Sequence, residues 1–203
     1  MPPWEAKKLL FSRAASQKGL GRKRKLLFID ATKAHLNAKC EVEAYIDLPD
    51  EIREPGKCAK LLYWLYGMRP AARGWEDTYA EKLMGIGFEQ GASAPTLFKH
   101  VEKSMECVVH GDDFTILGFE EDLLELSKTM MSWFEIKVRG ILGPDAHDLK
   151  SLSILNRNVE WLEWGIKIEA DDKHAEKIID YFNLDENSKS MVSLGKKDDG
   201  ENP

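Results

Sequence analysis

Cysteine is scarce in this chain, and long apolar runs are missing. The 203 residues include three cysteines, Cys40, Cys58 and Cys107, which are widely spaced and form no CxxC pair. That spacing argues against a disulfide framework or a zinc site and favours a reducing compartment, cytoplasmic or nuclear. No apolar run approaches the ~20 residues that a membrane span needs, so we expect no span. The net charge of −6 argues against a generally basic nucleic-acid binder.

Positive charge is nevertheless concentrated at the start of the chain. Residues 1–25 contain eight lysines and arginines against a single acid, Glu5. This pattern suits phosphate contact or a weak organelle-targeting segment, but it also suits a solvated helix face followed by a linker. We expect residues 1–24 to form a basic helix, over 3–15, and a linker.

The most informative stretch is residues 108–118, VVHGDDFTILG, in which Asp112 and Asp113 lie between two apolar runs. The pattern predicts a β-hairpin with a tight Gly-Asp-Asp turn. A third aspartate, Asp30, ends the apolar run 26–29. Carboxylates gathered at strand ends need a counter-charge, and hard divalent cations prefer oxygen ligands. A strand-end aspartate with a hairpin pair is the layout of a two-metal nucleotidyl-transfer palm.

Turn chemistry alone offers another interpretation, because aspartate and glycine are common turn residues. His110, beside the pair, could tune a carboxylate, contact a phosphate, or serve only as a polar residue next to the turn. If the palm interpretation holds, we expect the carboxylates of Asp30 and Asp112 to converge, with Asp113 pointing elsewhere in a weaker role.

Further motifs, in order, make the sequence resemble the reverse transcriptase of copia-type LTR retrotransposons, from about Trp4 to Leu184. That family has D-x-x-x-A-F-L-N-G, E-x-V-Y-M-x-x-P, L-Y-G-L-K-Q-A-P-R-x-W, a G-F…D-P-x-L-F stretch and a Y-V-D-D hairpin. The corresponding segments here are DATKAHLNA at 30–38, EVEAYIDLP at 41–49, LYGMRPAARGW at 65–75, GF at 87–88 and PTLF at 95–98, followed by the hairpin.

The resemblance implies an RNA-directed DNA polymerase that acts on an RNA or DNA primer–template and dNTPs with Mg²⁺ or Mn²⁺. Its implied catalytic and metal-binding residues are Asp30, Asp112 and Asp113. Its implied substrate-binding residues are His35, Arg69, Arg73 and Gly111. The two arginines could reach towards phosphate; alternatively, Arg73 and Trp75 pack the start of a helix.

Departures from the family fall on the nucleotide cradle rather than on the metal ligands. His35 replaces an aromatic residue that lies under the incoming sugar and excludes a 2′-hydroxyl, so ribonucleotides should be admitted more readily. Pro70 replaces a glutamine that faces the nucleotide, and His110 and Gly111 replace the Tyr-Val pair of the hairpin, where Gly111 should loosen the turn. We therefore expect weak metal binding and primer extension near background.

The fold class expected is α+β: a palm-like antiparallel sheet with helices on one face, plus a C-terminal hairpin and helix. We expect the palm over 25–150, a thumb-side connection over 151–184 and a disordered tail over 185–203. Helices are predicted at 72–85, 120–133 and 172–182, and in the last of these Ala175, Ile178, Ile179 and Phe182 should face inward. Strands are predicted at 25–30, 42–48, 58–66, 96–101, 106–118 and 134–139, with a hairpin formed by 153–162 and 165–169.

Two functional hypotheses follow. In the first, the chain is a reverse transcriptase palm with a partial thumb and without the family's fingers or RNase H, and it is impaired. In the second, it is an inactive retrotransposon-derived remnant that serves as a structural or binding subunit of a larger assembly. A viral RNA-dependent RNA polymerase palm is a distant third, because the L-Y-G…R-x-W block argues against it.

Overall fold

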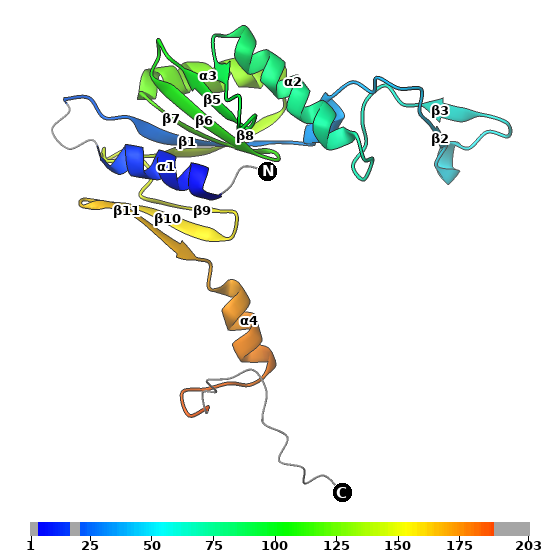
Figure 1. Cartoon of the computed structure of the whole chain (residues 1–203). Helices are drawn as coiled ribbons and strands as arrows, with labels where there is room; N and C mark the ends of the chain where they lie inside the picture. The colour runs from blue at the N-terminus through cyan, green and yellow to red at the C-terminus, as the bar shows by residue number, and fades with distance from the viewer. Residues whose placement is uncertain (1–3, 17–20, 189–203) are drawn as a thin grey trace, which may run out of the picture.

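A computed structural model describes residues 4–16 and 21–188. Its centre is a six-stranded antiparallel sheet in the order β4-β5-β6-β7-β1-β8 (Figure 1). Of the tail predicted at 185–203, residues 189–203 lie outside the described part. The strands are β1 Lys25–Ala31, β4 Glu89–Gln90, β5 Leu97–His100, β6 Met105–His110, β7 Asp113–Gly118 and β8 Ile136–Leu142.

Both faces of this sheet are covered, which explains why its central strands are apolar at successive positions. Helices α2 (Ala71–Gly85) and α3 (Glu120–Trp133) cover one face, where Trp75, Phe114 and Leu123 belong to one core. The start of α3 suits its helix dipole, because the first turn is acidic.

The opposite face is covered by α1 (Trp4–Ala15), so the expectation of helices on one face alone was wrong. The buried positions of α1 are spaced i, i+3, i+4 and i+7, one side of a helix. The three apolar ones, Leu10, Phe11 and Ala14, pack against Leu26, Phe28 and Val108 of the sheet. The four residues are Lys7, Leu10, Phe11 and Ala14.

A smaller sheet closes α1 in from its other side (Figure 1). It consists of β9 Ser151–Ile154, β10 Arg157–Leu162 and β11 Gly165–Ala170, in the order β11-β10-β9. The segment predicted as one strand over 153–162 is thus two strands. Leu155 and Asn156 divide it, because both adopt left-handed backbone conformations, with φ of 45° and 57°, that reverse the chain.

Two parts project from this body (Figure 1). One contains the short helices η1 Ala34–Asn37 and η2 Asp50–Ile52 and the two-stranded sheet of β2 Tyr45–Asp47 and β3 Cys58–Lys60. These strands are shorter than the predicted 42–48 and 58–66. The other is α4 Lys173–Tyr181.

The apolar side of α4 faces solvent. Ile178, Ile179 and Phe182 are 56%, 45% and 64% exposed, so the prediction that they face inward was wrong. The helical period of the segment was read correctly, but periodicity cannot say whether a partner surface is present. No helix in residues 4–16 or 21–188 is long and apolar enough to cross a membrane.

Candidate active site

Asp30 and Asp113 are direct cross-strand neighbours. The register of β1 and β7 pairs Asp30 with Asp113, and residues directly opposite in an antiparallel pair point to the same face, with Cβ atoms about 5 Å apart. Both residues are half-buried. The expectation that Asp113 points away from Asp30 was therefore wrong, because its strand begins at Asp113 itself.

Asp112 lies at the exposed tip of the hairpin, in a two-residue turn between paired His110 and Asp113. Gly111 has φ +66° at the first turn position, as a type II′ turn requires. Trp75 of α2 donates its indole Nε1–H to the Gly111 carbonyl at 2.9 Å. The Ala31 amide of β1 donates to the Asp112 carbonyl, also at 2.9 Å. Two elements thus hold a turn that the sequence led us to expect to be loose.

Burial is the largest electrostatic influence at this corner. It raises the pKa of the Asp113 carboxyl, a nearby lysine acts to lower that pKa, and the neighbouring Asp112 and Asp30 act to raise it. His110 lies directly opposite Asp113 on β6, and burial, followed by a nearby lysine, lowers the pKa of its imidazole. Asp113 and Asp112 act in the opposite direction on the same imidazole.

That lysine is Lys7 of α1, which was not singled out from the sequence. Its side chain points inward and is 1% exposed, and its Nζ has no hydrogen-bond partner among the residues that the structure describes. Burial lowers the pKa of the Lys7 ammonium, whereas Asp113 acts to raise it. The spacing of Lys7 with Leu10 and Phe11, at i, i+3 and i+4, indicated that Lys7 lies on the buried side of the helix. A lysine in an apolar stripe is, however, usually interpreted as solvated.

His35 lies in η1, which begins after Lys33 in a left-handed conformation, φ 52°. Its imidazole stacks on Tyr66 with ring centroids 4.3 Å apart and planes inclined by 32°. The Nδ1 atom is buried and has no hydrogen-bond partner in the described part of the chain. His35 thus combines a buried, unpaired ring nitrogen with an aromatic neighbour.

The two candidate arginines are on the surface. Arg69 is exposed, and the Arg73 Nε donates to both carboxylate oxygens of Asp77, one turn along α2, at 3.0 and 2.9 Å. Arg73 and Asp77 also line a polar groove of about 470 Å³ between η1 and α2. Asn37, Lys39, Trp64 and Pro70 are among the other residues that line it.

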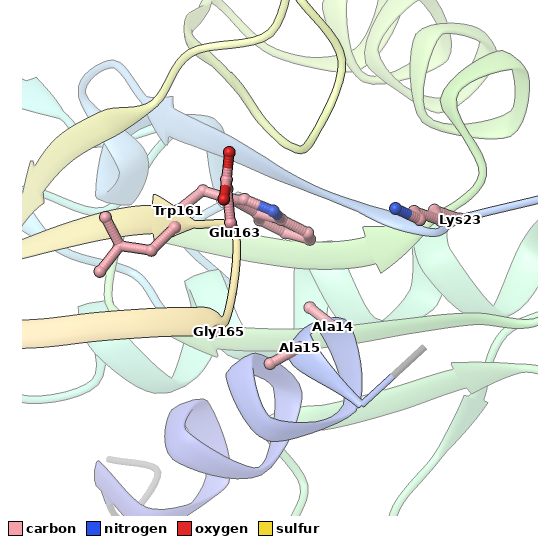
Figure 2. A pocket seen from close by; sticks show the side chains of 7 residues that line it. Ala14, Ala15, Lys23, Trp161, Glu163 and Gly165 are labelled. Atoms are coloured by element: carbon pink, nitrogen blue, oxygen red, sulfur yellow. The ribbon is translucent and has the colours of Figure 1, made fainter. Parts of the chain in front are cut away.

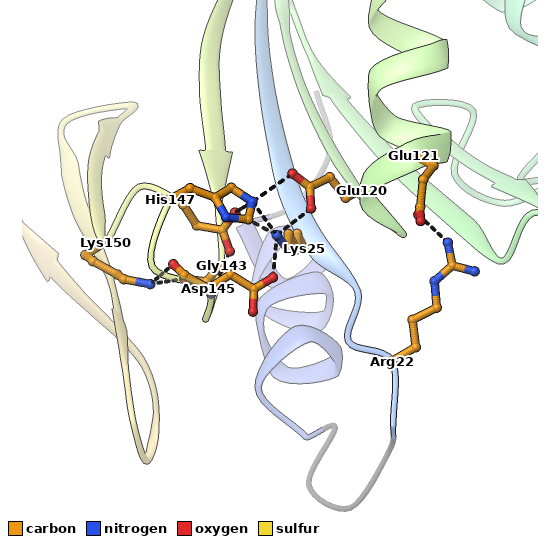
Figure 3. A network of polar contacts seen from close by, with 9 residues as sticks. Arg22, Lys25, Glu120, Glu121, Gly143, Asp145, His147 and Lys150 are labelled. Carbon is orange, nitrogen blue, oxygen red and sulfur yellow. Dashed lines mark hydrogen bonds and ion pairs between the residues drawn. The ribbon is translucent and has the colours of Figure 1, made fainter.

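A second charged cluster lies at the other end of β1, and sequence reasoning missed it. The buried Lys25 ammonium contacts carboxylate oxygens of Glu120, Asp145 and Asp148 at 2.7, 2.7 and 2.8 Å (Figure 3). His147 Nε2 lies 3.0 Å from Glu120. No spacing rule could have found it, since its members come from a strand, a helix start and a loop.

This Lys25 cluster has the shape of a metal site. One ligand atom each from Glu120, Asp145, His147 and Asp148 lies within 4.8 Å of the others. In the described ranges it is this set, and not the three aspartates, that converges so tightly. The Lys25 ammonium already supplies the positive charge, so the arrangement joins β1, α3 and the 143–148 loop as an ion-pair network.

A third feature is a cavity of about 60 Å³ at the C-terminal end of α1, opposite the end that carries Lys7. Figure 2 shows Ala14 and Ala15 on one side and Trp161, Glu163 and Gly165 on the other. The volume suits a water molecule or two rather than a nucleotide.

With this geometry established, comparison with known proteins identifies the family. Residues 5–194 match the family model described as reverse transcriptase (RNA-dependent DNA polymerase), and the chain belongs to that family. The resemblance drawn from ordered motifs is confirmed at the level of the reverse transcriptase domain, while its copia-type assignment stays a prediction. No solved structure matches the chain.

Proposed function

We propose that the chain is the palm of a copia-type RNA-directed DNA polymerase that works by two-metal nucleotidyl transfer. Asp30, Asp112 and Asp113 are the proposed catalytic residues and metal ligands. The observation that supports this most is the pairing of Asp30 with Asp113 beside the Gly111–Asp112 turn, in a chain of the reverse transcriptase family. Strands that place acids side by side at one corner of a sheet suit a palm.

The donor set fits Mg²⁺ or Mn²⁺. Carboxylate oxygens are the ligands that these hard cations prefer, and two half-buried carboxylates in register repel each other unless a cation lies between them. Bound ions would neutralise the phosphates and lower the pKa of the primer 3′-hydroxyl. Asp30 and Asp113 come from rigid strands, and the Trp75 and Ala31 hydrogen bonds fix the turn that carries Asp112.

The proposed substrates are an RNA or DNA primer–template and a dNTP. His35 would face the sugar, where an imidazole can hydrogen-bond a 2′-hydroxyl that an aromatic hydrocarbon ring would reject. Ribonucleotides should therefore be accepted more readily than by His35→Phe. Arg69 and Arg73 would contact phosphate, and for Arg73 this requires exchange of its Asp77 partner.

Impairment is part of the proposal. Pro70 has no side-chain amide to donate to a nucleotide, and the sheet face that carries Asp30 and Asp113 is covered by α1. Nucleotidyl transfer depends on positioning, so lost contacts cost rate rather than metal binding. The same covered face favours a second candidate function, an inactive remnant that acts as a structural or binding subunit with other proteins.

Single-nucleotide primer extension on an RNA template, with Mg²⁺ and with Mn²⁺, tests the proposal. We expect weak addition that disappears in Asp112→Asn and persists in Asp47→Asn, an exposed strand aspartate outside the corner. Absence of any Asp112-dependent addition, with template binding retained, would favour the remnant. Fast, processive extension would overturn the proposed impairment.

A further inference from the structure

We propose that the Lys7 ammonium is an internal competitor of divalent cations at Asp30 and Asp113. By neutralising part of the carboxylate charge, it lowers the affinity of this corner for Mg²⁺ and Mn²⁺ in the protein as folded. The inference rests on the proposed function in one respect, that the aspartates bind metal at all.

The sheet pattern places Lys7 and the aspartates on the same side. Along β1, Asp30 shares its face with Leu26 and Phe28, because side chains alternate with a period of two. Leu26 and Phe28 pack with Leu10 and Phe11 of α1. Asp113 shares that face, since it is directly opposite Asp30.

The direction of α1 then brings Lys7 to the aspartate end. Arg13 forms an ion pair with Glu106, at the far end of β6 from His110. Lys7 lies nearly two turns earlier in α1 and therefore nearer to His110 and its neighbour Asp113. An electrostatic interaction between Lys7 and Asp113 agrees with this placement.

The Lys7 ammonium is unusual because it is buried without a hydrogen bond to any described residue. Its side chain is 1% exposed, and within residues 4–16 and 21–188 its Nζ has no hydrogen-bond partner. Buried ammonium groups normally have a hydrogen-bonded counter-ion, as Lys25 has in this same molecule. An ammonium that interacts with the Asp113 carboxylate, directly opposite Asp30, both stabilises that negative charge and opposes entry of a second cation.

Removal of the positive charge should strengthen metal binding. Two positive charges that interact with the same carboxylate repel each other even at the effective dielectric constant of a protein surface, about 20. We expect Lys7→Met, which keeps the length and apolar stem of the side chain, to bind Mn²⁺ about tenfold more tightly than the wild-type chain. Lys8→Met is the matched control, because Lys8 is the next residue of α1 and is exposed.

Mn²⁺ titration followed by electron paramagnetic resonance, on the full chain, measures this directly. Tighter binding by Lys7→Met with unchanged binding by Lys8→Met supports the inference. Equal tightening in both variants, or none in Lys7→Met, overturns it. Asp30→Asn separates this from the proposed function: if Mn²⁺ binding does not fall in Asp30→Asn, the metal site itself is wrong.

A metal-free measurement tests the Lys7–Asp113 coupling independently. In EDTA, the thermal midpoints of the wild-type chain, Lys7→Met, Asp113→Asn and the double variant form a double-mutant cycle. We expect Lys7→Met to change the thermal midpoint less favourably in the wild-type chain than in the Asp113→Asn background. Only in the wild-type chain does the substitution remove the attraction between the Lys7 ammonium and the Asp113 carboxylate. An additive cycle would overturn the inference even if Mn²⁺ binds.

Discussion

The two ends of β1 each bring a buried lysine together with acidic residues. They differ in whether the lysine ammonium forms ion pairs with those acids. At the start of the strand, Lys25 is 3% exposed and contacts three carboxylates at 2.7–2.8 Å. At its end, Asp30 is paired with another aspartate, while the Lys7 Nζ of α1 has no hydrogen-bond partner within residues 4–16 and 21–188.

The difference separates a structural cluster from a candidate functional one. A satisfied network stabilises the fold and leaves little affinity for a further cation. Carboxylates whose charge is only partly compensated cost stability, and groups whose charge is poorly satisfied gather where ligands bind. The Lys25 cluster has more acidic residues and a histidine, but it is thus the weaker candidate for a metal site.

The largest expected effect is at the satisfied end. Asp148→Ala removes the buried carboxylate that pairs with the Lys25 ammonium, and it should lower the free energy of unfolding by about 3 kcal/mol. Asp145→Ala removes a carboxylate from the same ammonium, but its side chain is 54% exposed, so its cost should stay below about 1 kcal/mol. Urea unfolding measures both, and equal costs would contradict the special role of the buried carboxylate.

Acid should remove the stabilisation that this network provides. Hydrogen bonds from Lys25 hold the pKa of Glu120 and of Asp145 below their ordinary values of 4.5 and 3.8. Stability from carboxylates with a lowered pKa is present above those ordinary values and is lost as pH falls through the folded-state pKa. The stability difference between the wild-type chain and Lys25→Met should therefore shrink below pH ~4.5. A difference that stays constant from pH 7 to pH 3 would refute this.

Trp75→Phe should have the next largest effect. The variant leaves the Gly111 carbonyl without its indole donor and opens a small space in a core where Trp75 is 1% exposed. We expect a loss of about 2 kcal/mol in unfolding free energy. Mn²⁺ affinity should also fall severalfold, because the turn that carries Asp112 is held less firmly. Trp133→Phe, a partly exposed tryptophan of α3, controls for indole loss and should leave Mn²⁺ affinity unchanged.

The smallest effect has the opposite sign. Asp30→Asn removes a like charge directly opposite Asp113 and should raise stability in EDTA by about 0.5 kcal/mol. Asp47→Asn is the control, because Asp47 pairs with Cys58 rather than with an acid. A loss of stability in Asp30→Asn would mean that the carboxylate is already satisfied.

Local patterns predicted the parts of the molecule that local physics determines. The helix at 120–133 was located to the residue, because its apolar stripe and acidic first turn agree. The hairpin around Gly111 also formed, because Gly-Asp between apolar runs has few alternatives. The position of α1 was not predicted, because Lys7 interrupts the apolar stripe that would have marked its buried side.

The rest depends on contacts between segments far apart in sequence. The partnership of Lys25 with Asp148 crosses more than half the chain. The Trp75–Gly111 hydrogen bond joins a helix to a turn. The pairing of Asp113, rather than Asp112, with Asp30 follows from a one-residue choice of register, which changes the face of every side chain on a strand.

One measurement decides between the two ends of β1. Mn²⁺ is titrated into the wild-type chain and into the variants Asp30→Asn, Asp113→Asn and Asp148→Asn, and circular dichroism checks that each variant is folded. We predict that Mn²⁺ binding is lost in Asp30→Asn and Asp113→Asn and retained in Asp148→Asn. Binding lost in Asp148→Asn and retained in Asp30→Asn would place the metal in the Lys25 cluster and contradict the account.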